Sequence, residues 1–154
     1  MILPRKIITA SISGSLFAII LGLVVPDPFG EEYLSSIQGY LYSASSVVPI
    51  YMMYSFPVIL IYGVTMSIIS DKAGEFISFK LGKNKIDLIV SGVLHIIFGL
   101  ILFWFSLVAS LLFFITDRIM KSRNKKYEMK EAIKSLLIPV FVYLFFMGIV
   151  WGNQ

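Results

Sequence analysis

The chain contains a single histidine, and its position is the first feature that could carry chemistry. His95 lies in the apolar run from Gly92 to Phe105, which holds no other ionisable side chain. Ser91 and Gly99 are four residues away on either side, so a helix would place all three on one face. An ionisable group in a membrane-spanning run is a candidate functional residue by default. His95 and Ser91 therefore form the candidate intramembrane polar site.

The surroundings of His95 favour a packing role over a proton- or ligand-sensing role, which is the alternative. Neutral imidazole predominates near pH 7, so a histidine is cheaper to bury than a carboxylate. The long apolar stretches contain no Asp, Glu, Lys or Arg that could complete a proton relay. One histidine also cannot supply the three or four ligands of a zinc site. We expect the imidazole to hydrogen-bond a carbonyl or a tyrosine hydroxyl at a helix–helix contact.

Enzyme motifs are missing from the sequence. It has no His-Glu-x-x-His, Gly-x-Ser-x-Gly, phosphate-binding loop or dinucleotide fingerprint. The lack of cysteine excludes thiolate catalysis, disulfides and Cys-ligated metal centres. A Ser–His dyad is formally available, but serine is also a common packing residue in membrane helices. We expect no catalytic residue, no metal site, no cofactor and no enzymatic activity.

Long apolar segments must position these residues. Hydrophobic residues make up 58% of the 154 and charged residues 14%, whereas soluble domains carry about a quarter charged residues. A helix needs about 20 apolar residues to cross a bilayer. The sequence predicts a single all-α domain over 1–154, an integral membrane bundle of about four transmembrane helices. The expected spans, all free of Lys, Arg, Asp and Glu, lie near 7–25, 47–70, 88–116 and 135–151.

Two of the predicted spans are irregular. The second carries Pro49 and Pro57, which predict a bent helix. The third would be about 42 Å long as one helix, more than the roughly 30 Å hydrocarbon core, so it must tilt, protrude or bend. Between them, 71–87 is expected to form a short amphipathic interfacial element. After the third, charge spacing around Glu131 predicts a helix leading into the last span.

The distribution of basic residues conflicts with four spans. Four crossings would place six Lys and Arg on the N-terminal side and seven on the other, so the positive-inside rule hardly discriminates. Three arrangements resolve the conflict. In the first, the first helix sets the orientation, with a cytoplasmic N-terminus and a basic third loop as an exception. In the second, 88–116 is re-entrant, which places all 13 basic residues inside. In the third, the chain inserts both ways up. We favour the first, since the first span usually sets orientation.

Small residues recur every four positions in the first span, as Ala10, Gly14, Ala18 and Gly22. Small residues let membrane helices approach closely, which is a main source of their association in lipid. We expect this stripe to pack against another span of the same chain, and the alternative is a dimer face. The positive formal charge of the chain sits beside apolar spans, which indicates lipid contacts rather than nucleic acid.

The loop before the last span is the most basic segment. Its bland interpretation is a solvated determinant of topology, and the sharper one is a patch that binds anionic lipid headgroups or an acidic partner. Its candidate contact residues are Arg118, Lys121, Arg123, Lys125, Lys126 and Lys130.

The run from Tyr54 to Asp71, Tyr-Ser-Phe-Pro-Val-Ile-Leu-Ile-Tyr-Gly-Val-Thr-Met-Ser-Ile-Ile-Ser-Asp, resembles the second span of a family of small uncharacterised multi-span membrane proteins of Bacillus-type bacteria. The resemblance covers about one helix. It implies a multi-pass protein of the cell membrane and carries over no activity or functional residue.

Together these features predict a small accessory, regulatory or immunity-type protein that binds another membrane component, either another protein or a second copy of the chain. The alternative is a subunit of a transporter or channel, with His95 and the Pro-kinked second span lining the path. Coupled transporters usually carry intramembrane carboxylates or broken helices at the midplane. The apolar stretches lack the former, and only their prolines indicate the latter.

Overall fold

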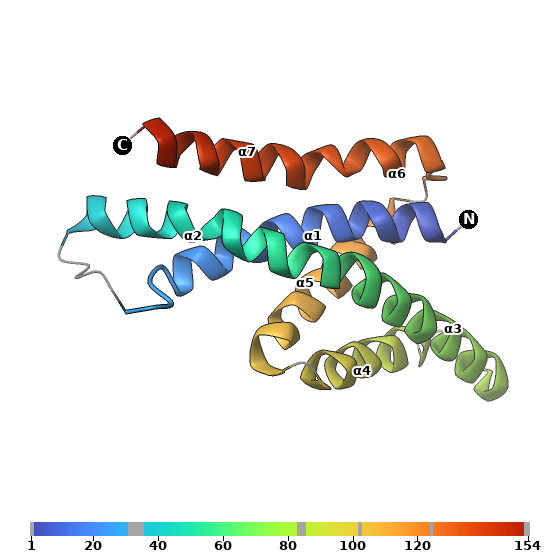
Figure 1. Cartoon of the computed structure of the whole chain (residues 1–154). Helices are drawn as coiled ribbons and strands as arrows, with labels where there is room; N and C mark the ends of the chain where they lie inside the picture. The colour runs from blue at the N-terminus through green and yellow to red at the C-terminus, as the bar shows by residue number, and fades with distance from the viewer. Residues whose placement is uncertain (1, 31–35, 83–85, 102, 124, 153–154) are drawn as a thin grey trace.

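Every element in the described part of the chain is helical, as expected for an all-α protein. The computed structural model describes residues 2–30, 36–82, 86–101, 103–123 and 125–152. Figure 1 shows the helices in chain order. They are α1 (Leu3–Val24), α2 (Ile37–Val58), the π-helical turn η1 (Ile59–Gly63), α3 (Val64–Leu81), α4 (Ile86–Ile101), α5 (Phe103–Ser122), α6 (Met129–Ser135) and α7 (Leu137–Gly152).

Three of these rods are long and apolar enough to cross a membrane: α1, the continuous 45-residue rod from α2 through α3, and the pair α6–α7. Figure 1 shows that α1 and α6–α7 both run away from the end where the N-terminus lies, while α2 runs back towards it. The three rods form an up-down-up bundle, in which α1 packs on α2 and α7 packs mainly on α2.

The apolar stretch 88–116 is two antiparallel helices, so the prediction of one long helix there is wrong. Asp87 at the start of α4 pairs with Lys121 near the end of α5, with 3.7 Å between Oδ2 and Nζ. Further along, the Ser110 hydroxyl donates to the carbonyl of His95 at 2.5 Å. A Cβ placed on Gly99 would come within 3.1 Å of the Leu107 Cα, so the absent side chain allows the two helices to touch. The described residues therefore hold three rods of membrane length instead of the four expected.

The rod from α2 to α3 continues through both prolines. Pro57 has no N–H and crowds the carbonyl four residues earlier, which disturbs the helical ladder. The π-helical turn follows directly, at Ile59–Gly63, and the rod changes direction past it in Figure 1. The expectation of an irregular second span is thus met. Of the segment 71–87, expected to form a separate interfacial element, residues 71–81 are the end of the same rod, which is capped by Gly82 with a left-handed φ of 63°. Ile86 and Asp87 begin α4, and residues 83–85 lie outside the described residues.

The small-residue stripe of α1 lies inside the bundle. Ala10 and Ala18 have no exposed surface, and the position of a Cβ on Gly14 would be 3.0 Å from the Phe56 ring. Gly22 is tighter still, since a Cβ there would be 2.5 Å from Val48 Cγ2. The stripe is therefore an internal packing face against α2, where the small residues allow a close approach.

The helix expected near Glu131 is α6. Glu128 and Glu131 form a reciprocal capping box at its start, which satisfies backbone N–H groups that the first turn leaves free. Ser135 at its end lies 3.1 Å from Ser11, hydroxyl to hydroxyl, so α6 begins the third rod at the same end of the bundle as the N-terminus.

Gly22→Ala is expected to destabilise the bundle by about 1–3 kcal/mol, because the added methyl overlaps Val48 and overpacks the α1–α2 contact. Gly148→Ala is the matched control, since no atom lies within 4 Å of its Cβ position. Thermal unfolding in detergent micelles would measure both. Equal melting temperatures for the two variants would contradict the packing described.

Candidate functional site

Five charged side chains from three helices meet at the N-terminal end of the bundle. Arg5 and Lys6 come from α1, Asp71 from α3, and Asp117 and Arg118 from α5. These five residues are called the ion cluster below. It contains three cations and two carboxylates, so its formal charge is +1.

Lys6 is the centre of the ion cluster. Its side chain has no exposed surface, and its ammonium group donates to Asp71 Oδ2 at 2.6 Å and Asp117 Oδ2 at 2.8 Å. Its third hydrogen bond goes to the Ser67 hydroxyl at 2.7 Å. All three protons of the ammonium therefore have acceptors, which is the condition under which a buried lysine can stay charged.

The guanidinium groups of Arg5 and Arg118 are partly exposed and lie beside the buried carboxylates. Arg5 binds both carboxylates, through Nε to Asp117 Oδ1 at 3.0 Å and Nη2 to Asp71 Oδ2 at 3.2 Å. Arg118 donates from Nη2 to Asp71 Oδ1 at 3.2 Å and lies over the Phe114 ring, 5.1 Å from its centroid. Each carboxylate thus has more than one cationic donor, and neither is left as a free base.

His95 is connected to the ion cluster through Ser91, which contacts both. Its Nδ1 is 2.7 Å from the carbonyl oxygen of Ser91, so Nδ1 carries the proton and Nε2 is left as an acceptor. The Ser91 hydroxyl donates to Asp71 Oδ1 at 3.1 Å. Ser91 therefore touches the histidine with its backbone and the ion cluster with its side chain.

The imidazole packs between aromatic rings. Phe114 lies 5.1 Å away between ring centroids and Phe113 lies 6.4 Å away. Nε2 is buried, and none of the described residues forms a hydrogen bond with it. A buried acceptor without a donor costs free energy. Among the described residues of the site, Arg118 Nε is also buried without a hydrogen-bond partner.

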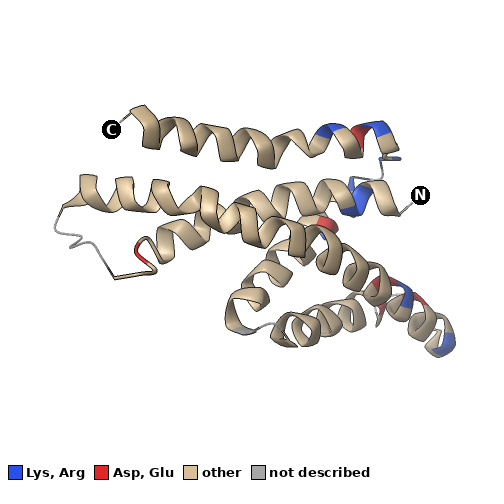
Figure 2. Cartoon of the chain, viewed as in Figure 1, with Lys and Arg blue, Asp and Glu red and all other residues tan. Residues whose placement is uncertain are grey.

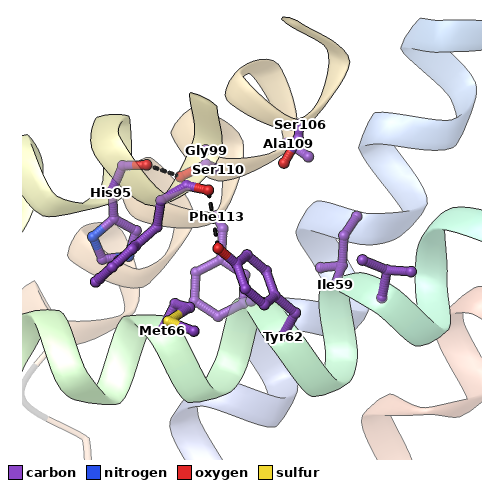
Figure 3. Close-up of a pocket in the computed structure, with 12 residues that line it drawn as sticks. Ile59, Tyr62, Met66, His95, Gly99, Ser106, Ala109, Ser110 and Phe113 are labelled. Carbon is purple, nitrogen blue, oxygen red and sulfur yellow. Dashed lines mark hydrogen bonds between the residues drawn. The ribbon is translucent and has the colours of Figure 1, made fainter. Parts of the chain in front are cut away.

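A small cavity of about 50 Å³ adjoins His95. Figure 3 shows Tyr62, Met66 and Phe113 around it, with His95 on the opposite wall. The Tyr62 hydroxyl donates to the Phe98 carbonyl at 3.1 Å, so it is already engaged. Towards the other end of the bundle, a wider groove of about 660 Å³ lies between α1, α2 and the start of α5.

The apolar stretches hold no Asp, Glu, Lys or Arg, but the fold brings the carboxylates of Asp71 and Asp117 into the ion cluster beside Ser91. Asp71 and Asp117 each follow directly after an apolar stretch. Asp71 was therefore expected in an interfacial element and Asp117 in a loop, whereas α3 and α5 continue through them. The two aspartates share a sequence feature that could have identified them: each comes directly after an apolar run and is followed by a basic residue.

The basic loop residues do not gather into one site. Arg118 belongs to the ion cluster, and Lys121 pairs with Asp87. Lys125 donates to Glu131 at 2.7 Å, and this hydrogen bond and the carboxylate charge raise the pKa of Lys125. The remaining candidates are exposed: Arg123, Lys126 and Lys130. In the described residues, no group of three or more His, Asp or Glu side chains could hold a metal ion.

Comparison with protein-family models, curated proteins and solved structures finds no match for this chain. The resemblance of the second span to a Bacillus-type family stays a prediction.

Asp71→Asn is expected to destabilise the protein by about 3–5 kcal/mol, because it leaves the buried Lys6 with one counter-charge in place of two. Glu131→Gln is the matched control, since it removes the charge of the solvent-exposed pair with Lys125, and exposed pairs contribute little to stability. Thermal unfolding in micelles distinguishes the two. A small effect of Asp71→Asn would show that the ion cluster contributes little to stability.

Proposed function

We propose that the chain is a multi-pass membrane protein in which three rods cross the bilayer and α4–α5 form a re-entrant hairpin. The observation that supports this best is the ion cluster. It joins the first turns of α1 to the last turns of α5, while Asp87 at the start of α4 pairs with Lys121. Both ends of the hairpin are therefore at the N-terminal end of the bundle, as expected for a segment that enters and leaves on one side.

The charge distribution supports a cytoplasmic location for that end. Figure 2 shows Lys and Arg at the N-terminal end of the rods. Asp27 follows the end of α1, at the opposite end of the bundle. With a re-entrant hairpin, all 13 basic residues fall on one side of the membrane, which agrees with the positive-inside rule. Basic residues there would face the anionic headgroups of a cytoplasmic leaflet.

In this arrangement the protein acts by binding and packing in the bilayer, as a small accessory or regulatory component of the cell membrane, and not as an enzyme. The carboxylates of the ion cluster support this role, because they are held by cations and cannot serve as free acids or bases. The broad apolar face of α7 is available to lipid or to another membrane protein. Its exposed side chains are Leu137, Val140, Phe141, Leu144, Phe145 and Trp151.

One observation favours the second candidate, a transporter or channel subunit. A cavity lies beside the only histidine and against the π-helical turn, and π-helical turns often occur at functional sites. On the cytoplasmic side, however, the fully hydrogen-bonded Lys6 fills the space between the helices. A continuous path would require the ion cluster to open.

Cysteine labelling from each side of the membrane tests the arrangement, and the chain has no native cysteine to interfere. We expect Phe29→Cys and Lys126→Cys, both at exposed positions, to react with an impermeant maleimide from opposite sides. Four full spans would place both positions on the same side. Reaction of each variant from both sides would indicate dual insertion and would also contradict the proposal.

Proton flux into proteoliposomes tests the accessory role against transport. Because the ion cluster closes the cytoplasmic end, we expect pyranine-loaded vesicles containing the protein to acidify no faster than protein-free vesicles. Asp71→Asn, which opens the ion cluster, serves as the comparison. A flux above background that His95→Ala abolishes would favour the transporter alternative.

A further inference from the structure

The cavity at His95 and the groove between α1 and α2 are adjacent. Val58, Ile59, Ser106 and Ala109 line both of them. The groove adds Phe17, Leu21 and Tyr54 among its walls and opens away from the ion cluster. A molecule lying in the groove could therefore extend one end into the cavity.

His95, which lines the cavity, has one buried nitrogen without a hydrogen-bond partner among the described residues. Nε2 of His95 is an acceptor because the Ser91 carbonyl fixes the proton on Nδ1, and no described residue donates to it. Two hydroxyls of the cavity wall already donate to carbonyls, Tyr62 to Phe98 and Ser110 to His95, and the third, on Ser106, lines the cavity and the groove alike. A ligand that brings a hydrogen-bond donor would satisfy Nε2.

The remaining walls exclude charged and strongly polar ligands. Phe98, Phe113, Met66 and Ile59 offer no partner for an ion, and an unpaired ion in such surroundings is costly. A cavity of about 50 Å³ has room for the hydroxyl end of a molecule, while the groove of about 660 Å³ is within the usual range for ligand sites.

We propose that this space binds a lipid alcohol, a membrane-soluble molecule with one hydroxyl group and a long hydrocarbon chain. Its hydroxyl donates to His95 Nε2, and its hydrocarbon chain lies in the groove. This site adds a class of ligand to the binding role proposed above. It rests on the proposed membrane arrangement, because the groove must lie within the bilayer.

The single histidine allows a direct test. With ¹⁵N-labelled histidine in nanodiscs, every imidazole signal comes from His95. We expect farnesol to shift the Nε2 resonance saturably, because the nitrogen accepts a hydrogen bond. Farnesyl methyl ether, which has the same chain and no donor, is expected to bind about tenfold more weakly and to leave Nε2 unshifted.

Two variants place the ligand in the space. Ser106→Leu and Val58→Phe each place a larger side chain at a position that lines both the cavity and the groove. Both substitutions should therefore exclude the ligand and abolish the farnesol shift. Since Val58 is half-exposed, that variant is expected to fold.

No farnesol shift in the unmodified protein, or an equal shift with the ether, would overturn the site. An Nε2 resonance already typical of a hydrogen-bonded nitrogen and unchanged by farnesol would mean that water fills the cavity, and would overturn it as well. Maleimide labelling of Phe29→Cys and Lys126→Cys in vesicles reports the membrane arrangement independently. Failure of the ligand site is therefore distinguishable from failure of the arrangement.

Discussion

The buried contact between Lys6 and the carboxylates of Asp71 and Asp117 is the interaction on which the rest of the structure depends. An ammonium group with no exposed surface is stable only if each of its protons has an acceptor, and Ser67 supplies the third. Those acceptors come from helices far apart in the sequence. Satisfying one lysine therefore fixes α1, α3 and α5 at a common level.

This constraint explains the hairpin. A continuous helix over 88–116 would carry Asp117 about 40 Å away from the start of α4 and leave Lys6 short of one counter-charge. Because α5 runs back along α4, Asp117 returns to the level of Lys6, and the close contact at Gly99 makes the return compact. A buried ion pair is weak evidence of net stability, because desolvation offsets much of its attraction. Its value here is specificity, since other registers of α5 leave charges unpaired.

Much of the fold is predictable from the sequence, and the failures have a physical cause. The helical class, the first and last rods and the disturbed middle rod follow from apolar length and proline chemistry. The fold-back does not, because 100–105 contains no proline, glycine or charge that would signal a break. Hydropathy gives the length of an apolar run, but whether the run crosses or returns is decided by tertiary partners.

The candidate site shows the same division. The face shared by His95, Ser91 and Gly99 follows from helical periodicity, and the structure uses each of them in a helix–helix contact or a hydrogen bond. The neighbouring carboxylates could not be placed, because residues at the ends of apolar runs look like loop residues when pairing in space is unknown. The unsatisfied Nε2 was equally hidden, since it depends on which atoms of three helices meet.

The spacing between the two ends of the hairpin tests this account most directly. Spin labels on Leu88→Cys and Ser122→Cys, at exposed positions of α4 and α5, can be measured by pulsed electron paramagnetic resonance in liposomes. Because Asp87 and Lys121 are in contact, we expect a distance of about 10–25 Å, as for labels on two packed helices. A distance near 50 Å, the length of an unbroken helix over the same residues, would contradict the hairpin and the role given to the ion cluster.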